Sequence, residues 1–197
     1  PYITINPLNT ITLTSASGTN AQVVCDNTTI VDITYATTGA TGVTVSGLPA
    51  NLIWNWNANV VTISGTLSVG TTNTFNYTIT TTGGVGVATA TGSIAVTTPA
   101  NAGTLSGNQS ICVAGTTTFT PTIVGGSWSS SDNTVATVDA SGVITGVGAG
   151  TATINYTVSG TGGCSNATAT RTVTVIPPFA ITVTGGCQGS PFILKVM

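Results

Sequence analysis

The sequence of 197 residues has almost no charge: charged residues make up 3% of it, and histidine and glutamate do not occur. General acid and base catalysis depends on histidine or on paired carboxylates, and metal sites draw on His, Cys, Asp and Glu. Two basic residues against a net charge of -2 also exclude a groove that binds phosphates. The sequence therefore predicts no enzyme activity, no cofactor, no metal site and no nucleic acid partner.

Long apolar runs are missing too, since no segment approaches the roughly 18 apolar residues that a membrane-spanning helix needs. We therefore expect no membrane span in this chain. About a fifth of the residues are Thr, which together with Val and Ile is typical of half-buried strands, whereas helix-forming residues are scarce. The 25 Gly and 8 Pro lie between short apolar runs and mark turns. The composition predicts an all-β protein.

The two ends of the sequence resemble each other. Residues 3–7 match residues 173–177, and at the same shift of about 170 positions residues 11–14 match residues 181–184. A cysteine follows in both cases. We therefore expect the chain to be a piece of a longer array of repeats.

Turn residues cluster at positions 97–103, which predicts a domain boundary there. Residues 9–98 and 99–177 are then two domains. Residues 1–8 would be the last strand of a preceding repeat, and residues 178–197 the first strands of the following one. Neighbouring repeats of the same chain are the expected partners.

Within these blocks the apolar residues alternate with polar ones, as in strands with one buried face. Ala152, Ile154 and Tyr156 alternate with Thr and Asn, and residues 135–146 form a predicted hairpin around an Asp-Ala-Ser-Gly turn. Seven or so short strands in about 90 residues are typical of an immunoglobulin-like antiparallel β-sandwich, with a closed barrel as the alternative fold. The predicted core anchors are Trp128, Tyr156, Tyr77 and Phe75.

Residues 128–138 and 149–154 resemble the bacterial Ig-like group 2 repeat. Residues 47–49, 61–66 and 90–96 resemble the PKD-like Ig repeats of giant Bacteroidota surface proteins. Such arrays occur in gliding-motility adhesins that are exported by the type 9 route. The resemblance implies a non-enzymatic, extracellular stalk that spaces a binding tip, with a surface or glycan ligand, from the cell.

The first block departs from this resemblance near its last strand, where Val85 and Val87 stand in place of the expected cysteine. Cys25 thereby loses its expected partner, and we predict Cys25 and Cys187 as free thiols. We predict a disulfide between Cys112 and Cys164, which lie in one domain. Closing a loop of about 50 residues stabilises a domain by about 4 kcal/mol in the chain-entropy model. Two buried free thiols are the alternative.

Two further sets of side chains have alternative interpretations. Trp54 and Trp56 lie two residues apart on a predicted strand and could form a platform for sugar rings, although packing in the core or at a domain interface is the simpler interpretation. Asp132 and Asp139 lack the spacing of a calcium loop and are expected to cap turns.

Self-assembly into a filament is a third functional hypothesis. An incomplete terminal sandwich could accept residues 192–196 of a neighbouring molecule as a strand.

Overall fold

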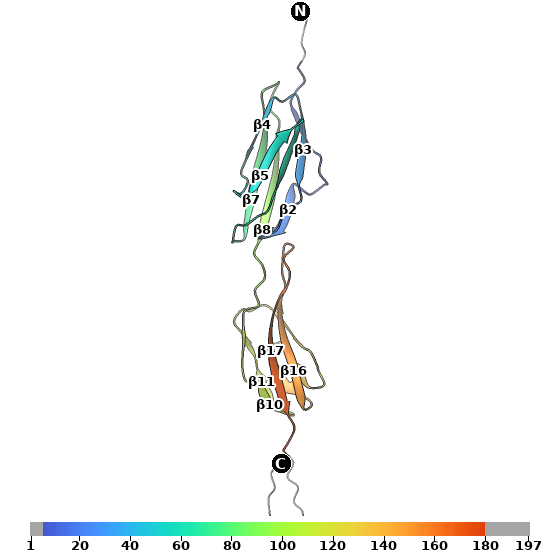
Figure 1. Ribbon diagram of the computed structural model, residues 1–197, viewed down its shortest axis with the longest axis vertical. Helices are drawn as coiled ribbons and strands as arrows, with labels where there is room; N and C mark the ends of the chain where they lie inside the picture. Colours follow the sequence, from blue (N-terminus) through green and yellow to red (C-terminus); the bar gives the residue numbers. More distant parts are fainter. Residues whose placement is uncertain (1–5, 180–197) are drawn as a thin grey trace, which may run out of the picture. The chain divides into compact units, whose positions relative to one another are not determined.

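The computed structural model describes residues 6–179, which form strands and turns without a helix. Their contacts divide the chain into two compact units. Unit 1 comprises Pro1–Ala100 with Ser159–Ala167, and unit 2 comprises Asn101–Val158 with Thr168–Met197. The strands of each unit are visible in Figure 1. The all-β prediction is confirmed. Within residues 6–179 no helix has the length and apolar character needed to cross a membrane.

Unit 1 is a sandwich of two four-stranded sheets. One sheet has the strand order β1-β3-β6-β5 and the other the order β2-β8-β7-β4. All neighbours are antiparallel except β2 and β8, which run parallel. The strands are β1 (Thr10–Leu13), β2 (Ala21–Cys25), β3 (Ile33–Thr38), β4 (Gly42–Ser46), β5 (Leu52–Asn57), β6 (Val60–Gly65), β7 (Asn73–Thr82) and β8 (Thr89–Thr97).

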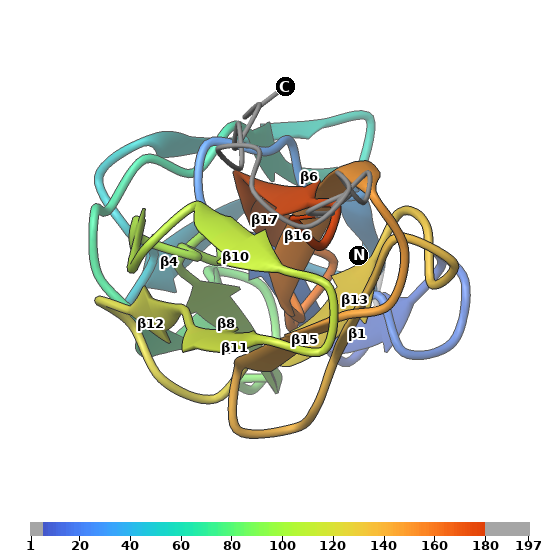
Figure 2. The same ribbon diagram turned by 90° about the horizontal axis from the view of Figure 1, so that it is seen from below.

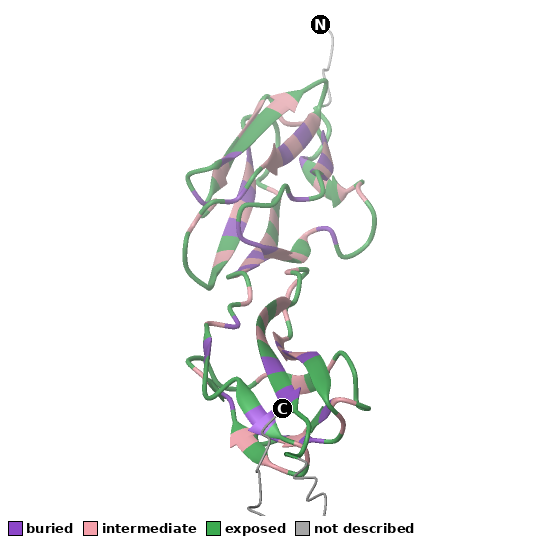
Figure 3. Cartoon of the chain, turned by 60° about the horizontal axis from the view of Figure 1, so that its bottom comes forward, coloured by how far each residue is buried: buried purple, intermediate pink, exposed green. Residues whose placement is uncertain are grey.

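The core of unit 1 lies between these sheets and follows the period of two in the sequence. In β7, Tyr77 and Ile79 are wholly buried while Phe75 packs at the margin of the core. The hydroxyls of Tyr77 and Tyr35 lie 3.3 Å apart inside the sandwich, so a buried polar group has a partner. Burial raises the pKa of the Tyr77 phenol, which stays neutral. Figure 3 shows the alternation of buried and exposed positions along the strands.

Unit 2 has three sheets, of four, three and two strands. The orders are β10-β17-β16-β13, β11-β15-β14 and β12-β9, with β10 parallel to β17. Figure 2 shows β10, β17 and β16 side by side. The strands are β9 (Leu105–Ser106), β10 (Ser110–Cys112), β11 (Thr116–Thr118), β12 (Thr120–Pro121), β13 (Ser127–Ser130), β14 (Ala136–Val138), β15 (Val143–Gly146), β16 (Gly150–Val158) and β17 (Ala167–Ile176).

The core of unit 2 is built on β16 and its neighbours. Ala152, Ile154 and Tyr156 are buried, as the alternation in the sequence predicts. Trp128 is the register partner of Tyr156 on β13, with ring centroids 4.7 Å apart, and packs against the core while remaining partly exposed. The predicted hairpin is β14 and β15, where the Asp139 carboxylate accepts the N–H groups of Ser141 and Val143 at 2.8 and 2.9 Å.

In both units the chain crosses to another sheet after its first strand, between β1 and β2 in unit 1 and between β9 and β10 in unit 2. In unit 2 it leaves β9 at Gly107, where φ is 129° and an added Cβ would lie 2.4 Å from the Thr118 carbonyl oxygen, so only glycine fits. Arg171 of β17 donates to the carbonyl oxygens of Leu105 and Gly107 at 3.0 and 2.7 Å. Its guanidinium lies 5.4 Å from the centre of the Phe119 ring. The charged side chain thus fixes the crossover against the core.

We expect Phe119→Ala to destabilise unit 2 by about 3–5 kcal/mol, because the fully buried ring leaves a cavity and Arg171 loses the surface on which it lies. Urea dependence of hydrogen exchange in β16 and β17 measures this change. The control is Val124→Ala, at a side chain that is 85% exposed, which should change stability by less than about 0.5 kcal/mol. Equal effects of the two substitutions would contradict the assigned core.

Candidate functional site

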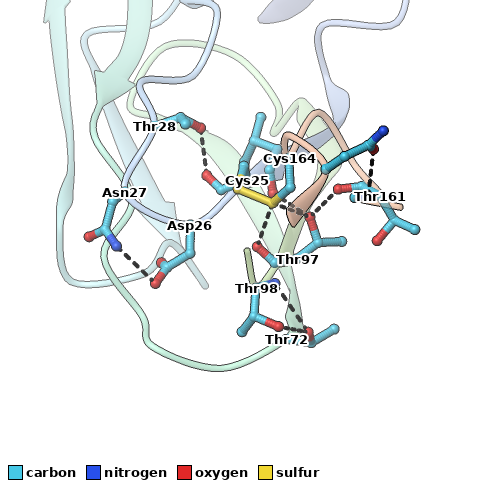
Figure 4. Close-up of a disulfide and its surroundings, with 12 residues drawn as sticks. Cys25, Asp26, Asn27, Thr28, Thr72, Thr97, Thr98, Thr161 and Cys164 are labelled. Atoms are coloured by element: carbon cyan, nitrogen blue, oxygen red, sulfur yellow. Dashed lines mark hydrogen bonds between the residues drawn. A yellow bond between two sulfur atoms is a disulfide. The ribbon is translucent and has the colours of Figure 1, made fainter. Parts of the chain in front are cut away.

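The most specific side-chain arrangement is a disulfide between Cys25 and Cys164. Cys25 ends β2, and its register partner is Thr97 at the end of β8. Cys164 lies in the loop that joins β16 to β17, and Ser159–Ala167 belongs by its contacts to unit 1. The Cα atoms are 4.8 Å apart, within the range that a disulfide spans. Figure 4 shows the two sulfur atoms among threonine side chains.

This pairing corrects the prediction from sequence. The predicted Cys112–Cys164 disulfide is wrong, and so is the prediction that Cys25 is free. Cys112 ends β10, is exposed, and has no disulfide partner among residues 6–179. The prediction assumed that a cysteine bonds within the sandwich whose strands flank it, but the loop with Cys164 packs in unit 1. Cys187 lies outside the described residues.

The loop with Cys164 is shaped by its own sequence. Cys164 donates its N–H to the Thr161 carbonyl at 3.0 Å, and the Asn166 side chain accepts the Gly160 N–H at 3.0 Å. Gly162 and Gly163 both have positive φ, at 58° and 83°. A Cβ on Gly162 would lie 2.5 Å from the Thr97 hydroxyl oxygen, so only glycine permits the loop to approach β8 this closely.

Thr97 joins the loop to the end of β8. Its hydroxyl oxygen lies 3.0 Å from the Thr161 carbonyl oxygen and 3.5 Å from the Cys164 sulfur (Figure 4). A covalent bond and neutral hydrogen bonds therefore hold the loop against Cys25 and Thr97.

Asp26 anchors the other side of the disulfide. Its carboxylate accepts the N–H groups of Val69 and Gly70 at 2.7 and 3.0 Å. The backbone N–H of Asp26 donates to the Thr97 carbonyl oxygen at 2.8 Å. The hydrogen bond from Val69, and then those from Gly70 and Asn27, hold the pKa of this carboxyl below its ordinary value against the opposing effect of burial. The backbone next to Cys25 is thereby tied to the loop between β6 and β7.

The other predicted site residues are separate from the disulfide. Trp56 packs against the core of unit 1 and donates its indole N–H to the Thr37 hydroxyl at 3.0 Å, whereas Trp54 is 40% exposed on the edge strand β5. The two rings thus lie in different environments, and the sugar platform stays a prediction. Asp132 accepts the backbone N–H of Thr134 at 2.8 Å and its hydroxyl at 2.6 Å, which caps a turn.

Comparison with known proteins supports an immunoglobulin-like fold. A family model described as the bacterial Ig-like domain (group 2) matches residues 90–170. The resemblance of the second block to this group is confirmed, while the PKD-like resemblance of the first block stays a prediction. No curated protein has a sequence that matches the chain.

A solved titin structure gives the same fold. The I-band fragment I67-I69 from titin aligns with a TM-score of 0.52 at 11% identity, over 80% of this chain and 64% of the titin fragment. This chain thus spans less than two thirds of that fragment. Human protocadherin-24 EC1-2 aligns with a TM-score of 0.46 at 10% identity, over 88% of this chain and 100% of the other.

A SusE-like, surface-located polysaccharide-binding protein from the heparin utilisation locus of Bacteroides thetaiotaomicron aligns with a TM-score of 0.32 at 15% identity. The alignment covers 85% of this chain and 34% of that protein. At these identities the likeness to the titin fragment shows the fold and nothing finer.

We expect Asp26→Asn to destabilise unit 1 at neutral pH, because an amide cannot accept both N–H bonds. Since the folded pKa lies below the ordinary value of 3.8, the carboxylate stabilises the fold fully above that pH and loses its effect as the pH falls through the folded pKa. Urea unfolding from pH 7 to pH 2 should thus show a steeper acid loss in the parent than in Asp26→Asn. Asp32→Asn, at an exposed position, is the control. Parallel pH profiles for the parent and Asp26→Asn would refute the assigned role.

Proposed function

We propose that this chain is a load-bearing, non-enzymatic segment of a secreted cell-surface protein. The observation that carries the proposal is the Cys25–Cys164 disulfide, whose cysteines are 139 residues apart. The chain passes between the units at Ala100–Asn101, at Val158–Ser159 and at Ala167–Thr168. The disulfide therefore closes a covalent loop that contains β3 to β16, whereas β1, β2 and β17 lie outside it.

Such a loop changes the path of tension along the chain. A pull applied at the two chain ends runs from the N-terminal side to Cys25, across the disulfide to Cys164, and onward along β17. Residues 26–163 are outside this path because the covalent bond is shorter than the chain that it bypasses. The backbone of this stretch carries no tension, so it resists extension without needing high thermodynamic stability.

The strand pairing favours the same role when the disulfide is reduced, because tension then enters the sandwiches at β2 and β10 and leaves them at β8 and β17. β2 pairs with β8 over five residues and β10 with β17 over three, both in parallel. Opposite forces along two parallel neighbours load all their hydrogen bonds together, whereas unzipping would break them one by one. The terminal strands of each sandwich are thus placed to resist shear.

The disulfide supports a place outside the cell. Disulfides persist in oxidising compartments, and this one links segments far apart in sequence. The match to bacterial Ig-like group 2 domains supports a bacterial surface protein. We extend the proposal to a stalk of the gliding-adhesin kind, exported by the type 9 route, with PKD-like and group 2 sandwiches at residues 9–98 and 99–177 and further repeats beside them.

Two alternative functions have separate signatures. Carbohydrate binding is supported only by the exposed ring of Trp54, since Trp56 is engaged with the core and Thr37. Filament assembly through residues 192–196 depends on a segment outside the described residues. Neither alternative requires the Cys25–Cys164 disulfide, whereas load bearing does.

Single-molecule stretching of the full chain between handles that use no thiol chemistry tests the proposal. We expect the oxidised chain to show no unfolding of residues 26–163. Reduction with dithiothreitol should add roughly 500 Å of contour length, at about 3.6 Å for each of the bypassed residues. Cys25→Ser should reproduce the reduced chain under oxidising conditions, whereas Cys112→Ser should behave like the parent. Full extension of the oxidised parent would contradict the proposed path of tension.

A further inference from the structure

Cys112 occupies in unit 2 the position that Cys25 occupies in unit 1. Each ends the short strand that runs parallel to the last strand of its sandwich: β2 beside β8, and β10 beside β17. The register partners are Thr97 for Cys25 and Ile176 for Cys112, and each partner is followed two residues later by proline. The two cysteines are thus equivalent in topology and in register.

The backbone beyond the two cysteines is the same as well. The Cys25 carbonyl accepts the Thr28 N–H at 3.2 Å, and the Cys112 carbonyl accepts the Gly115 N–H at 2.9 Å. The third residue of each turn has a left-handed conformation that is rare outside glycine, with φ of 62° at Asn27 and 63° at Ala114. Two sequences with different residues therefore build one local structure around the thiol.

The cysteine that bonds Cys25 comes from the last loop of a sandwich, by which we mean the loop joining its last two strands. In the second sandwich this loop joins β16 to β17 and carries Thr161-Gly162-Gly163-Cys164, although its contacts place it in unit 1. In unit 1 the corresponding loop reads Thr82-Gly83-Gly84-Val85 and is held by the Asn9 amide, which donates to the Gly83 and Gly86 carbonyls at 2.7 and 2.8 Å. The first sandwich therefore has a cysteine at the end of β2 but none in its last loop, whereas the second has a cysteine both at the end of β10 and in the loop between β16 and β17.

Cys112 occupies the position at which Cys25 is bonded, but it has no disulfide partner among residues 6–179, since Cys164 is bonded to Cys25. Its thiol is exposed, and its register partner Ile176 is 47% exposed beside it. The equivalent surface in unit 1, at Cys25, Val23 and Thr97, is the one that Gly162 and Cys164 approach.

We propose that Cys112 forms a second disulfide of the same kind, with the cysteine of a Thr-Gly-Gly-Cys last loop from a further sandwich. Two thiols would lose two protons and two electrons to a disulfide oxidant such as oxidised glutathione, which is reduced to two thiols as the new bond forms. Successive sandwiches are then joined by one disulfide each. The role of this second bond rests on the proposed load-bearing function, whereas its formation is tested separately.

The test extends the chain with a second copy of its own last loop. Residues 1–176 are joined directly to residues 98–197, with Cys187→Ser. Ile176 is then followed by Thr98-Pro99, as Thr97 is in the parent chain. After oxidation in a glutathione buffer, unpaired thiols are alkylated and disulfide-linked peptides are identified by mass spectrometry. We expect a bond between the first Cys112 and the second copy of Cys164, with loss of alkylation at that Cys112. The second copy of Cys112 should remain alkylated.

The Cys25–Cys164 bond in the same sample reports that the extended chain has folded. A matched control moves the thiol two residues along β10, in Ser110→Cys with Cys112→Ser, and should give no cross-link to the added loop. The proposal is overturned if the first Cys112 stays alkylated while Cys25–Cys164 forms, if the thiol at position 110 cross-links equally well, or if the unaltered 197-residue chain bonds Cys112 to Cys187. None of these outcomes affects the stretching result for the parent chain.

Discussion

The bond between Cys25 and Cys164 joins a strand near the start of the chain to a loop 139 residues later, and the other features of the site are arranged around it. Gly162 lets the loop approach β8, Thr97 binds its backbone, and Asp26 fixes the chain that follows Cys25. In the chain-entropy model, closing a loop of this length raises the free energy of unfolding by about 5 kcal/mol, because it lowers the conformational entropy of the unfolded chain. The bond therefore constrains unfolding as well as the path of tension.

Neutral hydrogen bonds replace charge throughout the described residues. Threonine hydroxyls pair across neighbouring segments, at 2.9 Å between Thr14 and Thr34 and 3.1 Å between Thr157 and Thr168. Exposed ion pairs weaken with salt, and carboxylates lose their effect in acid, whereas hydroxyl pairs depend on neither. A surface of this kind keeps its hydrogen bonds when the salt concentration or the pH changes. The charged side chains of Asp26, Asp132, Asp139 and Arg171 are exceptions, and each fixes backbone at a turn or at a point where the chain changes direction.

The fold could be predicted from the sequence because strand periodicity is a local property. The alternation through Tyr156 and the Asp139 turn each depend on a few neighbouring residues, and both elements form as expected. The disulfide could not be predicted, because the sequence does not show which unit the loop with Cys164 contacts. The shared Thr-Gly-Gly pattern of the two last loops was a usable signal, since it places Cys164 at the tip of a loop. The separate environments of Trp54 and Trp56 depend on the edge position of β5 and on Thr37, which spacing alone does not reveal.

The central claim is the identity of the bonded cysteines, and disulfide mapping of the full chain tests it most directly. The chain is alkylated without reduction, digested with pepsin under acidic conditions that prevent disulfide exchange, and analysed by mass spectrometry. The structure predicts a linked peptide that contains Cys25 and Cys164, together with a separate peptide in which Cys112 is alkylated. A linked peptide that contains Cys112 and Cys164 would contradict the account.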